Sequence, residues 1–132
     1  MSNHNPIQNK LVLFGAGKIG RSFIGQLFSK GGYEVVFIDI CKPVVDELNL
    51  RHNYNVVIKG EGSDKVINVK NVRGVFAGDT ESVIAEITTA DIAAVSVGLN
   101  GLKAIMPVIA KGLISRFEHS GAPLDINRRK SP

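Results

Sequence analysis

The sequence contains no tryptophan and a single cysteine, Cys41, among its 132 residues. One cysteine excludes a disulfide within the chain and is typical of the reducing cytoplasm, which we take as the expected compartment. No apolar run approaches the roughly 20 residues that a membrane-spanning helix needs. The first ten residues are polar and lack the apolar stretch of a signal peptide, so we expect no membrane partner.

The sequence also lacks the patterns that mark common catalytic and metal sites. Its histidines, His4, His52 and His119, are too scattered to share a metal ion, and no HExxH motif occurs. No GxSxG or GxxxxGK[ST] motif is present either. We therefore predict no metal site, and we assign no catalytic residue to this chain.

Positive charge is in modest excess, with 16 lysines and arginines against 12 acids and a net charge of +4. Three of the cations, Arg128, Arg129 and Lys130, lie close to the C-terminus, and without them the balance is 13 − 12 = +1. A nearly neutral body with a short basic end does not indicate a nucleic-acid partner. We interpret residues 1–9 as a flexible leader and residues 127–132 as a basic tail.

Residues 10–126 have the apolar patterning of one domain. Short apolar runs of the kind buried on both faces of a parallel sheet alternate with stretches whose apolar residues recur at helical spacing. The predicted strands, each followed by its helix, cover residues 10–14 and 19–29, 34–38 and 43–50, 72–77 and 81–88, and 92–97 and 102–113. Pro43 fits the first turn of its helix, whereas Pro107 predicts a kink.

The spacing of the apolar residues changes between the second and third of these strand–helix units. Residues 54–58 and 65–69 are predicted to be extended, and the glycine-containing segment between them is typical of a hairpin loop. The other strands alternate with helices, which favours right-handed crossovers and a parallel sheet. We predict a doubly wound, or Rossmann, α/β fold with strand order 3-2-1-4-5 and an inserted β-hairpin.

The first predicted strand leads directly into Gly15-Ala-Gly-Lys-Ile-Gly20, a GxGxxG motif that opens a helix. In that context Gly15 allows a tight turn, Gly17 lets a pyrophosphate approach the backbone, and Gly20 lets helix and strand pack closely. The helix N-terminus at Lys18 and Ile19 then offers N–H groups and partial positive charge to the phosphates. The alternative is a tight strand-to-helix turn that binds no ligand.

Asp39 lies 19 positions after Gly20, at the end of the second predicted strand. A carboxylate there accepts hydrogen bonds from the ribose hydroxyls of an adenosine and repels a 2′-phosphate, so we predict NAD as the cofactor. The alternative for Asp39 is a helix N-cap, and Lys42 nearby argues for NADP. Cys41 is expected to be a small apolar filler near the adenosine.

The strand predicted over residues 92–97 ends where a doubly wound sheet exposes its carboxyl ends to ligands. Val97 and Gly98 follow this end, and Gly98 would let a dinucleotide lie close to the backbone. An ordinary turn glycine is nearly as good an interpretation. We include both residues in the predicted cofactor site.

The residues around the glycine motif also resemble a known family. The run from Phe14 to Gly25, Phe-Gly-Ala-Gly-Lys-Ile-Gly-Arg-Ser-Phe-Ile-Gly, is similar to the opening fingerprint of the mannitol-1-phosphate 5-dehydrogenases, which are polyol-specific long-chain dehydrogenases. The resemblance covers about residues 10–126. Further similar segments are Phe37–Asp39, Leu48–Tyr54, Ser96–Gly98 and Ile105–Leu113.

This resemblance implies an NAD-dependent oxidoreductase that interconverts a hexitol phosphate and fructose 6-phosphate. It places Gly15, Gly17 and Gly20 under the pyrophosphate and Asp39 at the ribose. It also implies that a helical domain beyond this sequence supplies the catalytic lysine, so we expect the chain to stop before the catalytic domain and to be inactive alone. The alternatives are a stand-alone NAD(H)-sensing or regulatory module, and a remnant that binds nothing.

The strand order has a consequence for the edge of the sheet. The strand over Ile92–Val97 should lie between the first and the fifth strand, and the fifth keeps at most Leu124–Ile126 before the basic tail. We therefore expect this edge to be only partly covered, and Ile105, Val108 and Ile109 of the following helix to be exposed. A homo-oligomer, or a partner chain covering the Ile92–Val97 edge, is expected for that reason.

Overall fold

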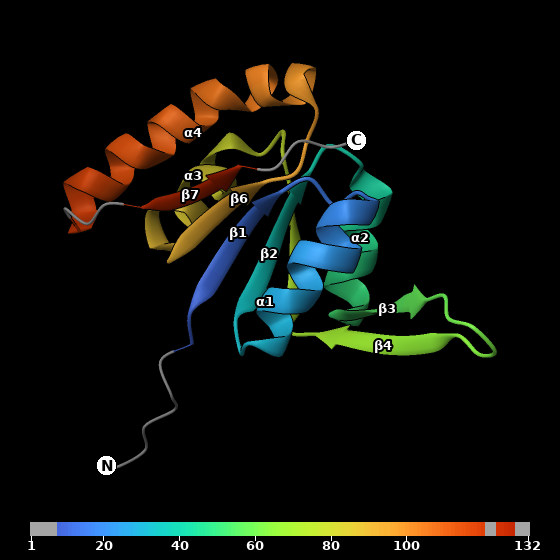
Figure 1. Cartoon of the computed structure of the whole chain (residues 1–132). Coiled ribbons are helices and arrows are strands. Elements are labelled where there is room, and N and C mark those ends of the chain that lie inside the picture. The colour runs from blue at the N-terminus through green and yellow to red at the C-terminus, as the bar shows by residue number, and fades with distance from the viewer. Residues whose placement is uncertain (1–7, 121–123, 129–132) are drawn as a thin grey trace, which may run out of the picture.

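Five parallel strands form the central sheet of the computed structural model, which describes residues 8–120 and 124–128 (Figure 1). They are β1 (Lys10–Phe14), β2 (Glu34–Asp39), β5 (Val72–Phe76), β6 (Ile92–Val95) and β7 (Asp125–Arg128). Their order in the sheet is β5-β2-β1-β6-β7, with every pair parallel. The predicted doubly wound sheet, including its strand order, is confirmed.

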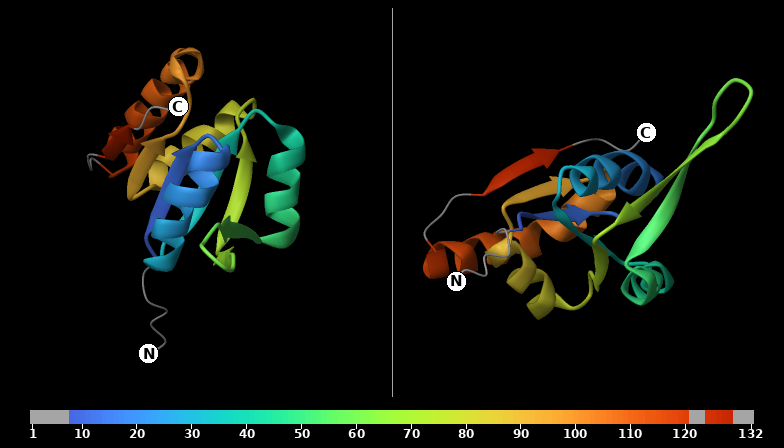
Figure 2. Two further views of the ribbon diagram at one scale, coloured as in Figure 1. Left: turned by 45° about the vertical axis from the view of Figure 1, so that its right-hand side comes forward. Right: turned by 90° about the horizontal axis from the view of Figure 1, so that it is seen from below.

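Helices cover both faces of this sheet because its inner strands are apolar on both sides (Figure 2). Leu11 and Leu13 of β1 face a cluster with the first two helices, whereas Val12 and Phe14 face a cluster with the last two. No helix in the described ranges is long and apolar enough to cross a membrane. The helical elements are η1 (Gly20–Gly25), a π-helical turn that continues into α1 (Gln26–Lys30), then α2 (Lys42–Arg51), α3 (Thr80–Thr89) and α4 (Leu99–Ser120).

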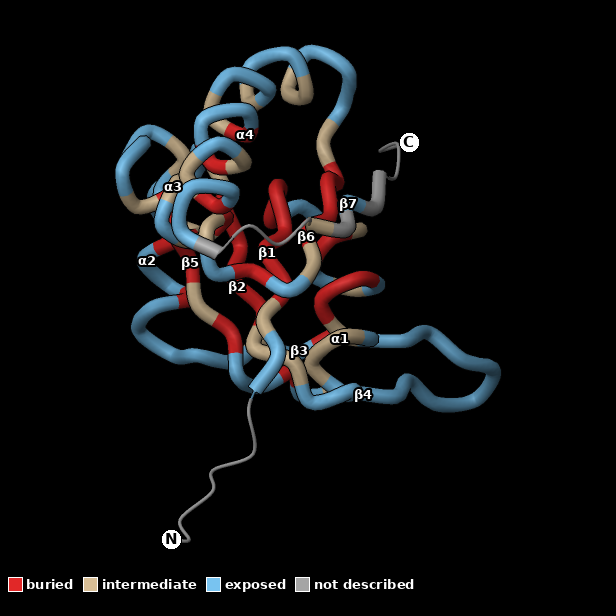
Figure 3. The backbone as a smooth tube through the Cα atoms, turned by 90° about the vertical axis from the view of Figure 1, so that its left-hand side faces the viewer, coloured by how far each residue is buried: buried red, intermediate tan, exposed pale blue. Residues whose placement is uncertain are grey.

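The predicted hairpin is present as β3 (Asn53–Ile58) and β4 (Lys65–Lys70), an antiparallel pair separate from the main sheet. Val56 and Val69 of this pair are buried in the cluster under the first two helices. Its outer part projects from the body of the molecule and is exposed to solvent (Figures 2 and 3). The hairpin is thus anchored at its base and free at its tip.

The expectation of a partly covered edge at Ile92–Val97 is wrong. β7 pairs with every residue of β6, from Ile92 opposite Asp125 to Val95 opposite Arg128. Backbone pairing in a parallel ladder does not require apolar side chains, so β7 extends into residues that the sequence assigned to the basic tail. The remaining tail, residues 129–132, and leader residues 1–7 lie outside the described residues.

The helix after β6 is also not exposed as expected. Ile109 is buried, and Ile105 and Val108 pack against the cluster formed with α3. Together with the covered edge, this burial removes the argument for a homo-oligomer or a partner chain on the Ile92–Val97 side. Cys41 was likewise expected to fill an apolar space, and it is exposed.

α4 is longer at both ends than the predicted helix over residues 102–113. Pro107 lies inside α4 without ending it, and tertiary contacts on both sides of the proline support the helix. Arg116 supplies one such contact. Its Nη1 donates to the carbonyls of Ile87 and Thr88, at 3.3 and 3.2 Å, and also to that of Ala90, at the C-terminal end of α3.

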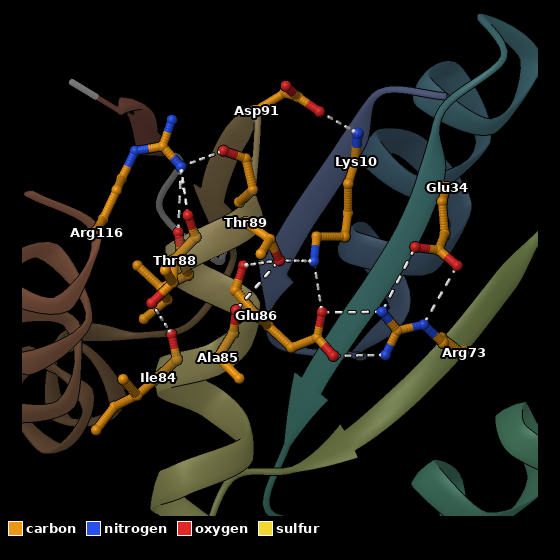
Figure 4. A network of polar contacts seen from close by, with 12 residues as sticks. Lys10, Glu34, Arg73, Ile84, Ala85, Glu86, Thr88, Thr89, Asp91 and Arg116 are labelled. Atoms are coloured by element: carbon orange, nitrogen blue, oxygen red, sulfur yellow. Dashed lines mark hydrogen bonds and ion pairs between the residues drawn. The ribbon is translucent and has the colours of Figure 1, made fainter. Parts of the chain in front are cut away.

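A network of charged side chains joins the sheet and α3 (Figure 4). Arg73 donates two hydrogen bonds to the Glu86 carboxylate, at 2.6 and 2.9 Å, and Lys10 Nζ lies 2.8 Å from the same group. Arg73 Nε also lies 3.3 Å from Glu34. Burial of Glu86 disfavours its charge, but hydrogen bonds from Arg73 and Lys10 outweigh burial and hold its pKa below the ordinary value.

We expect Glu86→Gln to lower the free energy of unfolding at pH 7 by about 1–3 kcal/mol, because Lys10 loses its anion and Arg73 loses the nearer of its two. A carboxyl whose folded pKa is lowered stabilises the protein above its unfolded pKa, and this contribution disappears as pH falls through the folded pKa. The difference between variant and unmodified protein should therefore shrink in acid. Urea denaturation at neutral and acidic pH measures both effects.

Glu47→Gln is the matched control for that variant. Glu47 pairs with Arg51 at 2.7 Å on the surface of α2, where the two side chains are 59% and 66% exposed. Exposed pairs contribute little to stability, so this substitution should change the free energy of unfolding by a few tenths of a kcal/mol at most. Equal effects of the two substitutions at pH 7 would contradict the stabilising role given to the network.

Candidate dinucleotide-binding site

The turn between β1 and the first helix has no side chains at its two points of closest approach. Gly15 has a φ of +106°, and a Cβ at that position would lie 2.4 Å from the Ser96 carbonyl oxygen. A Cβ on Gly20 would lie 2.5 Å from the Gly15 carbonyl oxygen. The geometry agrees with the predicted tight turn at Gly15 and the predicted close packing at Gly20.

Gly17 differs from both, because no atom beyond its immediate chain neighbours lies within 4 Å of the position that its Cβ would take. Gly17 and Lys18 are exposed and Ile19 is half-buried, so open space adjoins the start of the helix. The N–H groups of a first helical turn have no acceptor within the helix, and the helix dipole adds partial positive charge there. This is the arrangement of an anion-binding turn.

Asp39 lies at the end of β2, directly beside this turn. Its Oδ2 accepts a hydrogen bond from the Ala16 N–H at 2.7 Å, and its Oδ1 accepts one from the Cys41 N–H at 2.7 Å. Cys41 is the N-cap of α2 and α2 has no side-chain cap, so Asp39 is not the helix N-cap of the alternative interpretation. Each carboxylate oxygen retains a second lone pair with which it can accept a hydroxyl.

The end of β6 lies against the same turn. Ser96 N–H donates to the Phe14 carbonyl at 2.8 Å, and the half-buried Val97 packs against the cluster under α4. Gly98 is exposed, and no atom lies within 4 Å of its Cβ position. Its carbonyl accepts from the Leu102 N–H at 2.9 Å, so Gly98 is a turn glycine at the start of α4 and is also open to a ligand.

Two exposed apolar side chains adjoin Asp39, one in the neighbouring strand and one next in the chain. Phe76 is the neighbour of Asp39 in the adjacent strand and is 38% exposed, and Ile40 is 81% exposed. Lys42 Nζ lies 6.0 Å from the centre of the Phe76 ring. The lysine that argued for NADP thus lies over an aromatic ring, and the Asp39 carboxylate lies at the turn itself.

A hollow of about 490 Å³ lies beside the anion-binding turn rather than in it. It is bounded by the first helix, α2 and the start of β3, with Arg21, Pro43, Val44 and Asn55 among its lining residues. Gly17 and Lys18 are exposed at the turn itself, which suits an extended ligand that lies across strand ends. In the part of the chain that the structure describes, no group of three histidine, cysteine, aspartate or glutamate residues is placed to hold a metal ion.

Several features of the site could not be predicted from the local sequence pattern. The Ala16 N–H meets Asp39 only because the β1 and β2 ends are neighbours, and Phe76 joins them through its pairing with Asp39. The π-helical turn at Gly20–Gly25 leaves the apolar period almost unchanged. Tyr54, from the hairpin, contacts this turn, and its only sequence signal was its place in the family-like segment Leu48–Tyr54.

Comparison with known proteins gives the family. Residues 9–127 match the family described as the mannitol dehydrogenase Rossmann domain. The chain is 43% identical over 112 residues to the mannitol-1-phosphate 5-dehydrogenase of Lactococcus lactis subsp. cremoris (strain MG1363), covering 84% of this chain and 29% of that protein. It is 42% identical over 110 residues to the enzyme of that name from Talaromyces marneffei, covering 83% of this chain and 28% of that protein.

A third relative is the mannitol-1-phosphate 5-dehydrogenase of Lactococcus lactis subsp. lactis (strain IL1403), with 44% identity over 119 residues. The match covers 89% of this chain and 31% of that protein, so the chain spans about 30% of the length of these relatives, their Rossmann domain. The parallel sheet, the glycine turn at its carboxyl edge and these matches agree. The chain belongs to the mannitol dehydrogenase Rossmann domain family.

Proposed function

We propose that this chain binds NAD(H) across the carboxyl edge of its sheet. The observation that carries the proposal is the pairing of the open turn at Gly17 with the Asp39 carboxylate, which is hydrogen-bonded to that turn through Ala16. The pyrophosphate would lie on the first helical turn at Lys18 and Ile19, as such turns bind phosphate. The ribose hydroxyls would donate to Asp39, with Phe76 and Ile40 offering apolar surface to the adenine.

Val97 and Gly98, at the end of β6, would border the path of the dinucleotide toward the nicotinamide. When bound, NAD supplies the hydride acceptor of an alcohol oxidation. The described residues of this chain contribute binding and orientation: N–H groups for the phosphates, a carboxylate for the ribose, and a backbone at Gly17 without a side chain. We assign the reacting groups of the substrate site to no residue of this chain.

We propose that this domain serves an oxidoreductase that interconverts a hexitol phosphate and fructose 6-phosphate. The support is the sequence identity to mannitol-1-phosphate 5-dehydrogenases. We propose that the chain alone binds the cofactor without turnover, in the cytoplasm, where the exposed thiol of Cys41 stays reduced. No observation favours the NAD(H)-sensing alternative over the oxidoreductase.

Cofactor choice is the first test of the proposal. The unmodified chain should bind NAD more tightly than NADP, because Asp39 repels a 2′-phosphate. Asp39→Ala should weaken NAD binding by roughly 1–3 kcal/mol, since hydrogen bonds to a charged group are lost. Asp39→Asn should lose less NAD affinity and should narrow the difference between the two cofactors. Calorimetric titration with both nucleotides measures all three quantities.

The matched control is Asp46→Ala, which removes an exposed carboxylate from α2 at a distance of seven residues along the chain from Asp39. It should leave both affinities unchanged. Equal affinity of the unmodified chain for NAD and NADP would sink the assignment of Asp39 to the ribose.

Gly17→Val tests the pyrophosphate cradle. Because no atom lies within 4 Å of the Gly17 Cβ position, the larger side chain should leave thermal unfolding cooperative while blocking the approach of NAD. Gly15→Val is the contrast, since a Cβ there collides with the Ser96 carbonyl and should destabilise the fold itself. A Gly17→Val protein with full NAD affinity would show that the cradle is assigned to the wrong residues.

A further inference from the structure

The segment Leu48–Tyr54 resembles the family but has no part in the cofactor cradle described above. Its residues fasten the end of α2 and the start of the hairpin to β5. The Asn49 side-chain amide donates to the Gly74 carbonyl at 2.9 Å, and its carbonyl accepts from the Gly74 N–H at 2.8 Å. His52, with φ of 56°, hydrogen-bonds through Nδ1 to the Val72 carbonyl at 3.0 Å. These hydrogen bonds fix the direction in which the chain enters β3.

This direction brings Tyr54 onto the helix that follows the glycine turn. Tyr54 Oη donates to the Arg21 carbonyl at 2.6 Å, and its ring meets Phe37 of β2 edge-on, with ring centres 5.9 Å apart. Burial raises the pKa of Tyr54 far above its ordinary value, with the Arg21 cation opposing the shift. The phenol therefore remains a hydrogen-bond donor throughout the neutral range.

The carbonyl that Tyr54 contacts belongs to the π-helical turn Gly20–Gly25. A π turn holds one more residue than an α turn, and a side chain inserted among helix hydrogen bonds also distorts a helix locally. Tyr54 Oη supplies a hydrogen bond from outside the helix to the Arg21 carbonyl of this turn. Because the π turn begins at Gly20, its shape sets the direction of the helix immediately after the phosphate-facing turn.

Gly25 shows that this contact needs a special residue on the helix side. A Cβ on Gly25 would lie 2.5 Å from Tyr54 Oη and 2.8 Å from Phe37 Cζ. Only glycine lets the phenol and the β2 ring approach the helix this closely. The π turn, its glycine, the phenol and the family-like segment that carries the phenol thus form one connected arrangement.

We propose that Tyr54 is a positioning residue for the phosphate cradle. Through the Arg21 carbonyl it fixes the π turn, and thereby the orientation of the N–H groups at Lys18 and Ile19 that face the pyrophosphate. The hairpin, inserted between α2 and β5, acts as the support that carries Tyr54 to this place. The proposal rests on the proposed function, NAD binding at the glycine turn.

Tyr54→Phe tests the proposal because it removes only the hydroxyl and keeps the ring against Phe37. Affinity for NAD and for ADP should fall about three- to tenfold, the effect of one lost hydrogen bond on the cradle. Affinity for adenosine, which has no pyrophosphate, should stay the same. In the unliganded variant, hydrogen exchange at the Gly25 and Gln26 amides should be faster than in the unmodified chain.

Tyr33→Phe is the matched control. Tyr33 contacts Phe28 in α1, at the end of the helix away from the glycine turn, with ring centres 5.1 Å apart. It should leave all three affinities and the exchange rates near Gly25 unchanged. Urea denaturation of each variant separates loss of binding from loss of stability.

The outcomes distinguish the positioning role of Tyr54 from the proposed function, NAD binding at the glycine turn. If the unmodified chain binds NAD and Tyr54→Phe binds NAD and ADP as well as it does, the positioning role is overturned and the proposed function stands. A loss that is equal for adenosine, or that Tyr33→Phe reproduces, means general destabilisation and also overturns the positioning role. An unmodified chain that binds neither NAD nor ADP overturns the proposed function together with it.

Discussion

The backbone of Gly15 touches neighbours that leave no room for a side chain. A Cβ on Gly15 would collide with the Ser96 carbonyl, and a Cβ on Gly20 would collide with the Gly15 carbonyl. Because the two glycines lack side chains, the ends of β1 and β6 and the start of the first helix pack backbone against backbone. The N–H groups at the start of that helix consequently lie at the edge of the sheet. There the Asp39 carboxylate accepts a hydrogen bond from the Ala16 N–H of the turn. The candidate site exists because these pieces of backbone meet.

The charged network and the candidate binding site lie at opposite ends of the same strands. Lys10 and Glu34 begin β1 and β2, and their charges join Arg73 and Glu86 in a network that ties the sheet to α3. Among the side chains that the structure describes, the carboxyl ends carry no such network. They have an exposed glycine turn, a carboxylate held by backbone amides, and exposed apolar side chains. A doubly wound sheet permits this separation because all strand ends of one kind share one edge.

The parts of this structure that could be predicted are those whose pattern is contained in one continuous segment of the sequence. The strand at Lys10–Phe14, the glycine motif after it and the acid at Asp39 all followed from local pattern, and family resemblance agreed with them. Strand order followed from the general rules for parallel sheets. What failed depended on partners distant in sequence. β7 continues to Arg128 because β6 offers it a ladder, and α4 continues past its predicted end at Leu113 because it packs against α3.

The residues of the candidate site divide in the same way, into those that a local pattern predicts and those that it does not. Gly15, Gly17 and Gly20 could be assigned roles from spacing, because the turn is made by consecutive residues. Tyr54 could not, since its phenol reaches Arg21 across 33 positions of sequence and acts on a π turn that has no sequence signature. The exposure of Cys41 was missed for a related reason. A residue at the edge of a sheet can point to solvent even where its neighbours are buried.

The central claim is that NAD binds on the glycine turn between β1 and the first helix. Titration of ¹⁵N-labelled protein with NAD, followed by two-dimensional NMR, tests it at the level of single amides. The account predicts that the largest shifts fall on Gly17, Lys18 and Ile19 and on the Ala16 and Cys41 amides that hydrogen-bond to Asp39. Shifts confined to the hairpin, or no saturable shifts at all, would contradict it.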